Sequence, residues 1–454
     1  YRYFYAKEAR ITAMKPIDPR SLPRGLPGAI ARIAERVSNT TDRRDLPFHS
    51  AAEGMFLADL HADTLLWGIE PLNPRSGGHV DGPRLAAAGL GMQVFAAPTW
   101  TPLPFRTEDA RLVVSSKGFD QTAGLFPTEL LSPARTRNRI RRGRALRIAR
   151  RWHEMIEESR RADAPFIARP VLAAEDFDAP PAAGERPEIL TMLALEGLHW
   201  LDANAPAERV ETAVEELFAA GYRMMAPTHR FSNGLGGSNE DSDGRIGLTP
   251  AGRRFIAACL RRRIAIDLAH ASPALIREAC GVALTQEEGP RPVILSHCGI
   301  KAVHPTSRNL STGDIRSIAS TGGLIGIGFW RGAMGWRDEQ PFEEKMARIV
   351  ASFRAALEVL SAPDFAEEMI GRFGRYDPYE HLAFGSDFDG ATTMAFDVTG
   401  VSHVVAALAD VRDDDGAPGF PRDKLRLIAG ENARRVLRAA LSNAPAQPER
   451  MAAE

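Results

Sequence analysis

Eight short apolar runs occur between residues 57 and 387, and each one ends where polar residues begin. The first run is LADLHADTLLWG from Leu57. The others are GMQVFAAP from Gly91, ILTMLALEG from Ile189, YRMMAPTH from Tyr222, IAIDLAH from Ile264, PVILSH from Pro292, GGLIGIGF from Gly322 and HLAFGSD from His381. Short runs that are almost continuously apolar are typical of parallel strands, because both faces of such strands are buried.

Stretches with the apolar spacing of helices lie between these runs. They include PAERVETAVEELFAA from Pro206, TPAGRRFIAACLRRR from Thr249 and PFEEKMARIVASFRAALEVL from Pro341. An alternation of helices with eight strands predicts an α/β fold, a (β/α)₈ barrel of the TIM type, rather than an open doubly wound sheet. No Gly-x-Gly-x-x-Gly follows the first strand, which also disfavours a dinucleotide-binding sheet.

Composition along the chain predicts three parts. We expect an N-terminal arm or linker over residues 1–50, the barrel over 51–440 and a flexible tail over 441–454. Residues 99–185 separate the second and third strands and exceed what a minimal barrel needs, so we predict a helical insertion there. Nine arginines fall between Arg135 and Arg151. They fit either a solvated helix face or a surface that binds phosphate-rich partners or a membrane.

Charge and cysteine content exclude several classes of protein. The 57 basic and 58 acidic residues give a net charge of -1, so we expect no nucleic-acid partner. The three cysteines are too few for a disulfide framework and lack the C-x-x-C spacing of a structural zinc site.

The start of the chain leaves two interpretations of its location open. It begins with YRYFYAKEAR, in which aromatic and basic residues mix as they do at membrane interfaces. An upstream anchor or export signal is one interpretation, and membrane contact would then run through that anchor alone. An arbitrary chain boundary, with a cytoplasmic protein, is the other.

Polar residues that bind metals or move protons follow the apolar runs at matching ends. A lone histidine or aspartate at a strand end is usually structural, but here the pattern recurs on six strands. The candidate residues are His61, Asp63, Glu196, His229, His270, His297 and Asp387. Because the carboxyl ends of barrel strands meet on one face, we expect these side chains to converge.

The types of residue in this set indicate a metal centre. Imidazoles with carboxylates suit zinc and related divalent ions, and the absence of cysteine argues against a purely structural site. Three histidines and two carboxylates exceed what one catalytic zinc needs. Two ions about 3.5–4 Å apart, with a shared carboxylate and a bridging hydroxide, would use these five ligands.

The motif series resembles a known family. DLHADTLLW, ALEG, THRFSN, IDLAH, PVILSHCGIKAVHPTSRNLS and FGSDFDG occur in this order, followed by GENARRVL from Gly430. Over about residues 56 to 440 the series is similar to that of the renal (membrane) dipeptidase family of zinc-dependent, amidohydrolase-like peptidases. The resemblance implies a homodimeric enzyme that hydrolyses Xaa-Xaa dipeptides, including those with a D-residue at the C-terminal position.

The resemblance also assigns the metal ligands. It implies one zinc ion held by His61, Asp63 and Glu196, and Glu196 would bridge to a second ion. His270 and His297 would hold that second ion.

Three further roles come with the family pattern. His229 matches a histidine that is not a ligand and polarises the scissile carbonyl, and Arg308 matches the arginine that binds the free carboxylate of the substrate. Asp387 matches the catalytic aspartate, whereas Asp389 would face the other way or lie in the loop. The sequence departs from the animal members in the glycine-rich NGLGGSN after His229 and in Trp330, which replaces a tyrosine.

Two alternatives stay open. A related binuclear amidohydrolase would act on another amide, a lactam or an ester. Relatives with an HxH first motif and a modified bridging lysine are disfavoured, because the chain has HxD and Glu196 at these places. A catalytically silent binding module is disfavoured because all five expected ligands are present.

Overall fold

The computed structural model describes residues 39–67, 70–75, 77–100, 105–108, 111–114, 134–179, 186–240 and 244–442. Most of the predicted arm and nearly all of the predicted tail therefore lie outside the described residues, and the three domain boundaries stay predictions. Among the described residues, no helix is both long and apolar enough to span a bilayer.

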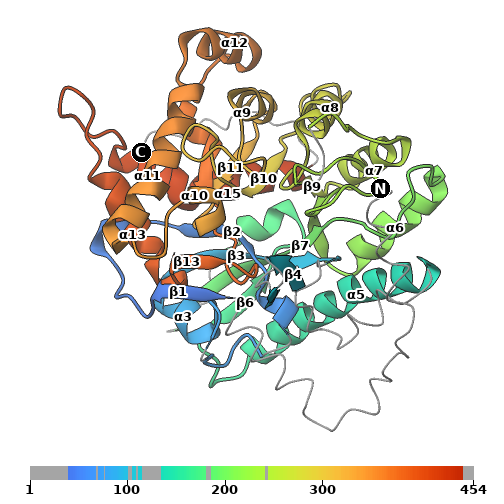
Figure 1. Cartoon of the computed structure of the whole chain (residues 1–454), viewed down its shortest axis with the longest axis horizontal. Helices are drawn as coiled ribbons and strands as arrows, with labels where there is room; N and C mark the ends of the chain where they lie inside the picture. The colour runs from blue at the N-terminus through green and yellow to red at the C-terminus, as the bar shows by residue number, and fades with distance from the viewer. Residues whose placement is uncertain are drawn as a thin grey trace.

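All eight apolar runs form strands. These are β2 (Leu57–Ala62), β3 (Leu90–Pro98), β7 (Glu188–Glu196), β8 (Tyr222–Ala226), β9 (Ala265–Ile266), β10 (Ile294–Cys298), β11 (Leu324–Ile327) and β12 (Leu382–Phe384). They pair in parallel in the order β10-β11-β12-β2-β3-β7-β8-β9. A parallel bridge between Asp267, just after β9, and Ile294 of β10 connects the two ends of this order. The result is a curled sheet, consistent with the predicted TIM-type barrel (Figure 1).

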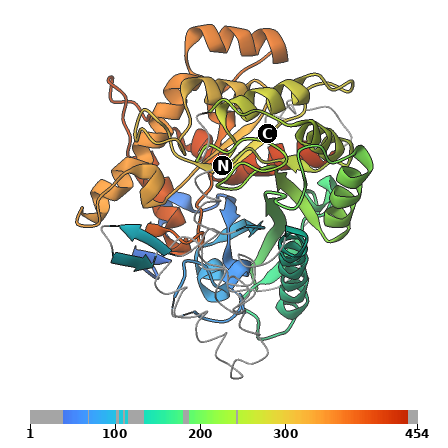
Figure 2. The same ribbon diagram turned by 45° about the vertical axis from the view of Figure 1, so that its right-hand side comes forward.

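Helices surround the sheet (Figure 2). They are α3 (Gly82–Ala87), α5 (Ala134–Ser159), α6 (Ala207–Ala219), α7 (Pro250–Arg261), α8 (Pro273–Leu284), α9 (Thr312–Ala319), α10 (Arg331–Met334), α11 (Phe342–Leu360), α12 (Pro363–Phe373), α13 (Val401–Ala409), α14 (Arg422–Arg426) and α15 (Asn432–Leu441). The three helices predicted from apolar spacing are α6, α7 and α11. Local signals fix some starts: Thr249 and Ser272 accept backbone N–H groups ahead of α7 and α8, and each helix begins with proline.

Apolar side chains fill both faces of the sheet. The larger cluster lies between strands and helices, and includes Phe95, Phe255 and Phe384. The second cluster joins residues such as Leu60 and Met192 of the strands to the apolar side of α15. Because α15 contacts β2, β9, β11 and β12, it packs across several strands at once. The polar residues at the carboxyl ends of the strands are not part of either apolar cluster.

Among the described residues, five strands were not predicted from the sequence. β1 (Thr40–Arg43) pairs in parallel with β13 (Thr393–Phe396), β6 (Ile167–Pro170) pairs in parallel with β7, and β4 (Phe105–Glu108) pairs antiparallel with β5 (Arg111–Val114). The arginine-rich stretch forms α5, whose residues Ala145, Ile148 and Trp152 are buried. This helix packs against β3, β6 and β7, so it is one of the helices that cover the sheet.

Candidate metal centre and active site

β2 and β7 each carry candidate ligands at their carboxyl ends. His61 lies near the end of β2, Asp63 directly follows it, and Glu196 is the last residue of β7. All three side chains are almost completely buried. His61 Nε2 lies 3.4 Å from Glu196 Oε1 and 3.9 Å from Asp63 Oδ1. The side chains of His61, Asp63 and Glu196 therefore point towards one another.

The remaining candidates lie at or just past the ends of four other strands. His297 is within β10, whereas His229, His270 and Asp387 follow β8, β9 and β12 by three or four residues. His270 and Asp387 have φ angles of 63° and 66°, in the left-handed region that non-glycine residues seldom adopt. Such strain clusters at functional sites, where the surrounding structure holds it in place.

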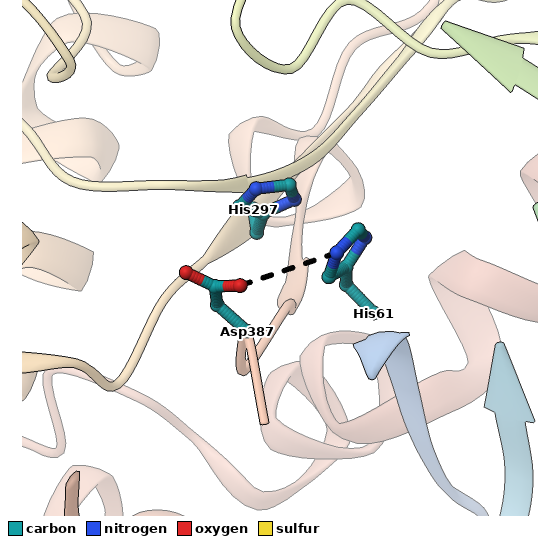
Figure 3. A group of neighbouring side chains, drawn as sticks. All are labelled: His61, His297 and Asp387. Carbon is teal, nitrogen blue, oxygen red and sulfur yellow. Dashed lines mark ion pairs between the residues drawn. The ribbon is translucent and has the colours of Figure 1, made fainter. Parts of the chain in front are cut away.

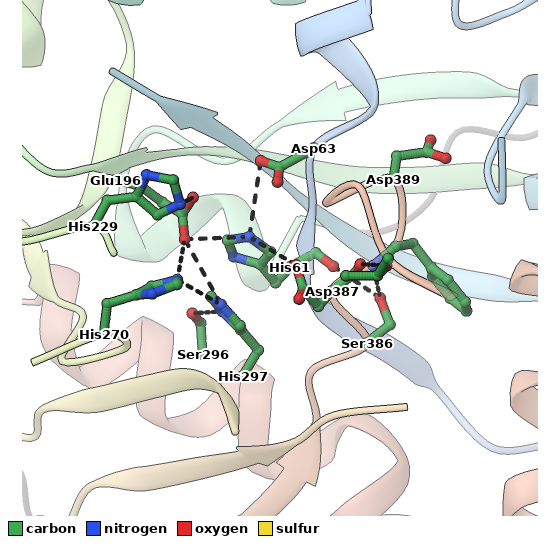
Figure 4. Close-up of polar contacts among 12 residues, drawn as sticks. His61, Asp63, Glu196, His229, His270, Ser296, His297, Ser386, Asp387 and Asp389 are labelled. Atoms are coloured by element: carbon green, nitrogen blue, oxygen red, sulfur yellow. Dashed lines mark hydrogen bonds and ion pairs between the residues drawn. The ribbon is translucent and has the colours of Figure 1, made fainter. Parts of the chain in front are cut away.

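Glu196 is the centre of the arrangement (Figure 4). Its Oε1 lies 3.4 Å from His270 Nε2 and 3.8 Å from His297 Nε2. Its Oε2 lies 3.4 Å from His229 Nε2. One carboxylate thus faces four imidazoles, counting that of His61.

In the described part of the chain, three overlapping groups of side chains could each hold a metal ion, with candidate ligand atoms no more than 4.8 Å apart. Two of them share the carboxylate of Glu196: one adds His61 and Asp63, and the other adds His270 and His297. The third group consists of His61, His297 and Asp387 (Figure 3). In it, Asp387 Oδ1 lies 4.0 Å from His61 Nε2.

Burial and mutual repulsion disturb the ionisation of these groups. Burial, with Asp63 and Asp387 nearby, raises the pKa of Glu196 well above its ordinary value. Burial, with Asp389 nearby, raises the pKa of Asp63 to about 8. Burial, with Arg308 nearby, lowers the pKa of His61 to about 3. In the protein alone, carboxylates are pushed towards protonation and imidazoles towards the neutral form. A divalent cation favours ionised carboxylates and neutral imidazoles, so it would complete the charge balance.

The model of one protein family matches almost the whole chain. The family is described as membrane dipeptidase, peptidase family M19, and the match covers residues 48–450. The chain belongs to this family. The enzyme class predicted from the motifs, a dipeptide-hydrolysing metallopeptidase, is therefore confirmed at the level of the family.

Individual relatives of this membrane dipeptidase family member are distant. An uncharacterized protein in the pqqA 5' region of Klebsiella pneumoniae is 25% identical over 232 residues, which is 50% of this chain and 74% of that protein. The dipeptidase verJ of Clonostachys rogersoniana is 27% identical over 251 residues, 55% of each chain. The match thus spans only about half of the fungal relative.

Solved structures share the fold. A metallo peptidase from Rhodobacter sphaeroides, liganded with a phosphinate mimic of the dipeptide L-Ala-D-Ala, aligns with a TM-score of 0.58 and 22% identity, over 85% of this chain and 99% of its own. The probable dipeptidase PvdM of Pseudomonas aeruginosa aligns with a TM-score of 0.55 and 14% identity, over 91% of this chain and 99% of its own. At these identities the likeness shows the fold.

Arg308 lies beside the metal cluster of this membrane dipeptidase family member. A cavity of about 280 Å³ is lined by Arg308 and Trp330 together with Asp63, Glu196 and Asp387. Nη2 of Arg308 donates to the backbone oxygen of His297 at 3.1 Å and lies 3.3 Å from His270 Nε2. Its guanidinium carbon lies 5.5 Å from the centre of the Trp330 ring. A permanent cation thus faces the cavity next to the candidate ligands.

His229 is oriented from behind by residues on the segment after β3. Its Nδ1 lies 2.9 Å from the carbonyl oxygen of Trp100, which can only accept, so Nδ1 is the donor. Nε2 then faces Glu196 and the cavity. In neutral His229 this Nε2 accepts hydrogen bonds, so donation to a developing oxyanion requires the protonated ring.

The arginines of α5 support the same region. Arg144 is fully buried and donates to the carbonyl oxygen of Thr99. Arg141 donates to the carbonyl oxygen of His199 at 2.9 Å, and its guanidinium lies 5.2 Å from the Trp100 ring. These contacts hold the backbone around Trp100. Arg141 and Arg144 of the arginine-rich stretch therefore bind backbone carbonyl groups within the protein. Neither interpretation of the sequence predicted this role.

The two aspartates of SDFDG have separate environments. Asp387 lines the cavity, whereas Asp389 points away from the cluster (Figure 4). Asp389 is fully buried and accepts hydrogen bonds from the His79 backbone N–H at 2.6 Å, Thr64 Oγ1 at 2.8 Å and Arg75 Nη1 at 3.0 Å. Although burial opposes it, this set of donors keeps the pKa of Asp389 below its ordinary value.

Sequence reasoning missed residues that orient the candidate ligands. Asp59 lies two residues before His61 in the same motif, and its carboxylate accepts from Gln93 Nε2 and from the backbone N–H of Ser386, each at 2.7 Å. It thereby ties β2 to the loop that carries Asp387. Glu240, in the loop after His229, approaches His270. For Asp59 the motif was a usable signal, but Glu240 lies in a loop without any periodic pattern.

Proposed function

We propose that this protein is a metal-dependent dipeptidase that uses two zinc ions. The observation that carries the proposal is the shared carboxylate of Glu196, which joins two groups of potential ligands and lines the cavity. Membership of the membrane dipeptidase family supports the choice of substrate. The Rhodobacter sphaeroides relative binds a mimic of L-Ala-D-Ala, which favours acceptance of a D-residue at the C-terminal position here as well.

The side chains present fit a pair of divalent ions. His61 Nε2, Asp63 Oδ1 and Glu196 Oε1 are buried and have no hydrogen-bond partner among the described residues. Orphaned polar atoms at such depth are costly unless they bind something. Imidazole nitrogen with carboxylate oxygen is the donor set of zinc hydrolases. His61, Asp63 and Glu196 would hold one ion, and Glu196, His270 and His297 the other.

The bound ions would lower the pKa of a water molecule and supply the nucleophile. The side chains of the cavity do the rest. Burial, with His199 and Arg230 nearby, lowers the pKa of His229 well below its ordinary value and favours the neutral ring. His229 would therefore donate from Nε2 to the scissile carbonyl oxygen only as negative charge develops there and raises this pKa, and Asp387 would carry a proton to the leaving amine. Arg308 pairs with the terminal carboxylate of the substrate. This contact selects substrates of dipeptide length and orients them in the cavity.

Metal content tests the binuclear proposal directly. Active, undepleted protein is expected to carry close to two zinc-type ions per chain, because the ligand set exceeds the need of one catalytic ion. Elemental analysis of the purified protein measures this. A single ion in fully active protein would contradict the binuclear arrangement and leave Glu196 as an ordinary ligand.

Substrate length and charge test the role of Arg308. A free dipeptide is expected to be a far better substrate than its C-terminal amide, because the half-buried guanidinium of Arg308 would lose its anionic partner. A tripeptide places its carboxylate one residue further from the metals and is also expected to be poor. Steady-state kinetics on the three compounds give the comparison as kcat/KM.

The matched variant is Arg308→Lys, which keeps the charge and removes the planar fork. It should raise KM for the free dipeptide and leave the amide nearly unchanged. Equal kcat/KM for dipeptide, amide and tripeptide in the wild type would contradict the binding of the terminal carboxylate by Arg308. The broader alternative, an amidohydrolase acting on another amide, a lactam or an ester, would then replace the dipeptidase proposal.

The finer organisation of the chain is also part of the proposal. We infer a closed (β/α)₈ barrel over residues 51–440, supported by the bridge between Asp267 and Ile294, with an insertion within 99–185 between β3 and β7. A homodimer follows by analogy with the family.

A further inference from the structure

Glu240 lies next to His270, one of the candidate metal ligands, on the Nδ1 side of its ring. It lies in the loop between β8 and α7 and lines the same cavity as Glu196 and Arg308. Its Oε1 is 3.3 Å from Nδ1 of His270. Its Oε2 pairs with Arg230 Nη2 at 2.9 Å. One carboxylate therefore connects an arginine to the ring of His270.

Backbone contacts fix Glu240 relative to His270. The N–H of Asn239 donates to the carbonyl oxygen of His270 at 2.9 Å. Ser238 forms an antiparallel bridge with Ala271, and the N–H of Ser272 donates to the carbonyl oxygen of Gly237 at 2.9 Å. The segment before Glu240 thus runs alongside the segment that carries the histidine. The contact between the two side chains rests on this paired backbone.

The contact determines which nitrogen of His270 can bind a metal. An ionised carboxylate only accepts hydrogen bonds, so Nδ1 of His270 carries the proton. The lone pair is then on Nε2, which lies 3.4 Å from Glu196 Oε1 and 3.1 Å from His297 Nε2. A carboxylate behind a ligand histidine also makes the imidazole more basic and hence a better ligand.

The other two ligand histidines are supported differently. Nδ1 of His297 lies 2.9 Å from Ser296 Oγ, which donates to Asp267 Oδ2 at 2.6 Å. His61 has no hydrogen-bond partner at either ring nitrogen among the described residues. Direct support by a carboxylate, with an arginine behind it, is thus seen at His270 and distinguishes it from the other two.

We propose that Glu240 is a positioning residue for the metal site formed by Glu196, His270 and His297, and that Arg230 holds its second carboxylate oxygen. Glu240 orients His270 and strengthens its bond to the ion, without being a ligand itself. The proposal rests on the proposed metal centre and assigns an additional residue to it. Its effect should be confined to one of the two ions, because Glu240 contacts neither His61 nor Asp63 in the described structure.

Metal titration of the chelator-stripped protein tests this, with zinc as the probe and calorimetry or competition with a chromophoric chelator as the readout. Glu240→Ala should weaken one of the two zinc affinities about 10–100-fold and leave the other unchanged. Glu240→Gln keeps the side-chain volume and an accepting oxygen but lacks the charge, so its loss should be intermediate. If the alanine variant fails to fold, the glutamine variant decides.

The matched control is Glu278→Gln. Glu278 is a carboxylate of the same region that pairs with Arg253 at 2.5 Å and accepts from the Leu248 N–H at 3.2 Å. This variant should bind both ions like the wild type. Folded Glu240 variants with both affinities within about twofold of the wild type would overturn the positioning role. Failure of the wild type itself to bind zinc would instead overturn the proposed metal centre, so the two failures are distinguishable.

Discussion

Glu196→Gln is expected to abolish most of the activity and to lower the metal content at the same time. The two groups of candidate ligands share this carboxylate, and an amide cannot offer two anionic oxygens to two cations. Stabilisation by a metal ion is worth several kcal/mol, so a loss in kcat/KM on the order of 10³-fold or more is expected. Elemental analysis and steady-state hydrolysis of a free dipeptide measure the two effects on one preparation.

Folding should survive this substitution. Burial and neighbouring carboxylates already raise the pKa of Glu196, so the protein without metal gains nothing from a charge at this position. Metal-free Glu196→Gln should therefore melt no lower than the metal-free wild type. The matched control is Glu188→Gln at the start of the same strand, where the carboxylate pairs with Arg169 at 2.9 Å. Activity of Glu196→Gln within a few-fold of the wild type would make Glu196 a structural residue.

The strands were predictable because burial on both faces leaves a continuous apolar signal. Every run identified in the sequence became a strand, even β9, which has only two residues. The convergence of the candidate residues was predictable for a related reason: the fold brings the carboxyl ends of the strands together, so polar residues at those ends lie close to one another. His61 and Glu196 are far apart in the sequence but both lie at the ends of strands that pair with β3.

Structure that depends on contacts between remote segments was not predictable in this way. The pairing of Thr40 with Thr393 joins segments whose sequences carry no recognisable strand pattern. The arginines of α5 show the same limit. Charge alone suggested a surface role, whereas Arg144 is buried and binds a backbone oxygen of the segment behind His229. Which carbonyl group a guanidinium reaches depends on packing, and packing has no local signature.

The motif SDFDG presents the sharpest case, because it offers two aspartates and the family pattern selects one. Asp387→Asn is expected to keep substrate binding and to lower kcat by about 10²–10⁴-fold, the usual contribution of a general acid or base. Its side chain lines the cavity, and its Oδ1 lies 4.0 Å from Nε2 of His61, one of the proposed ligands. Measuring kcat and KM separately for a free dipeptide distinguishes a loss of rate from a loss of binding.

Asp389→Asn should lower the stability of the protein and leave kcat nearly unchanged. Its carboxylate accepts hydrogen bonds from Thr64, Arg75 and the backbone of His79, and it faces away from the cavity. Loss of its charge should lower the free energy of unfolding by about 1–3 kcal/mol, measured by denaturant titration, with kcat changed only a few-fold. If instead Asp389→Asn stops turnover in folded protein and Asp387→Asn does not, the proton is carried by Asp389. The cavity would then have to open towards Thr64 during the reaction.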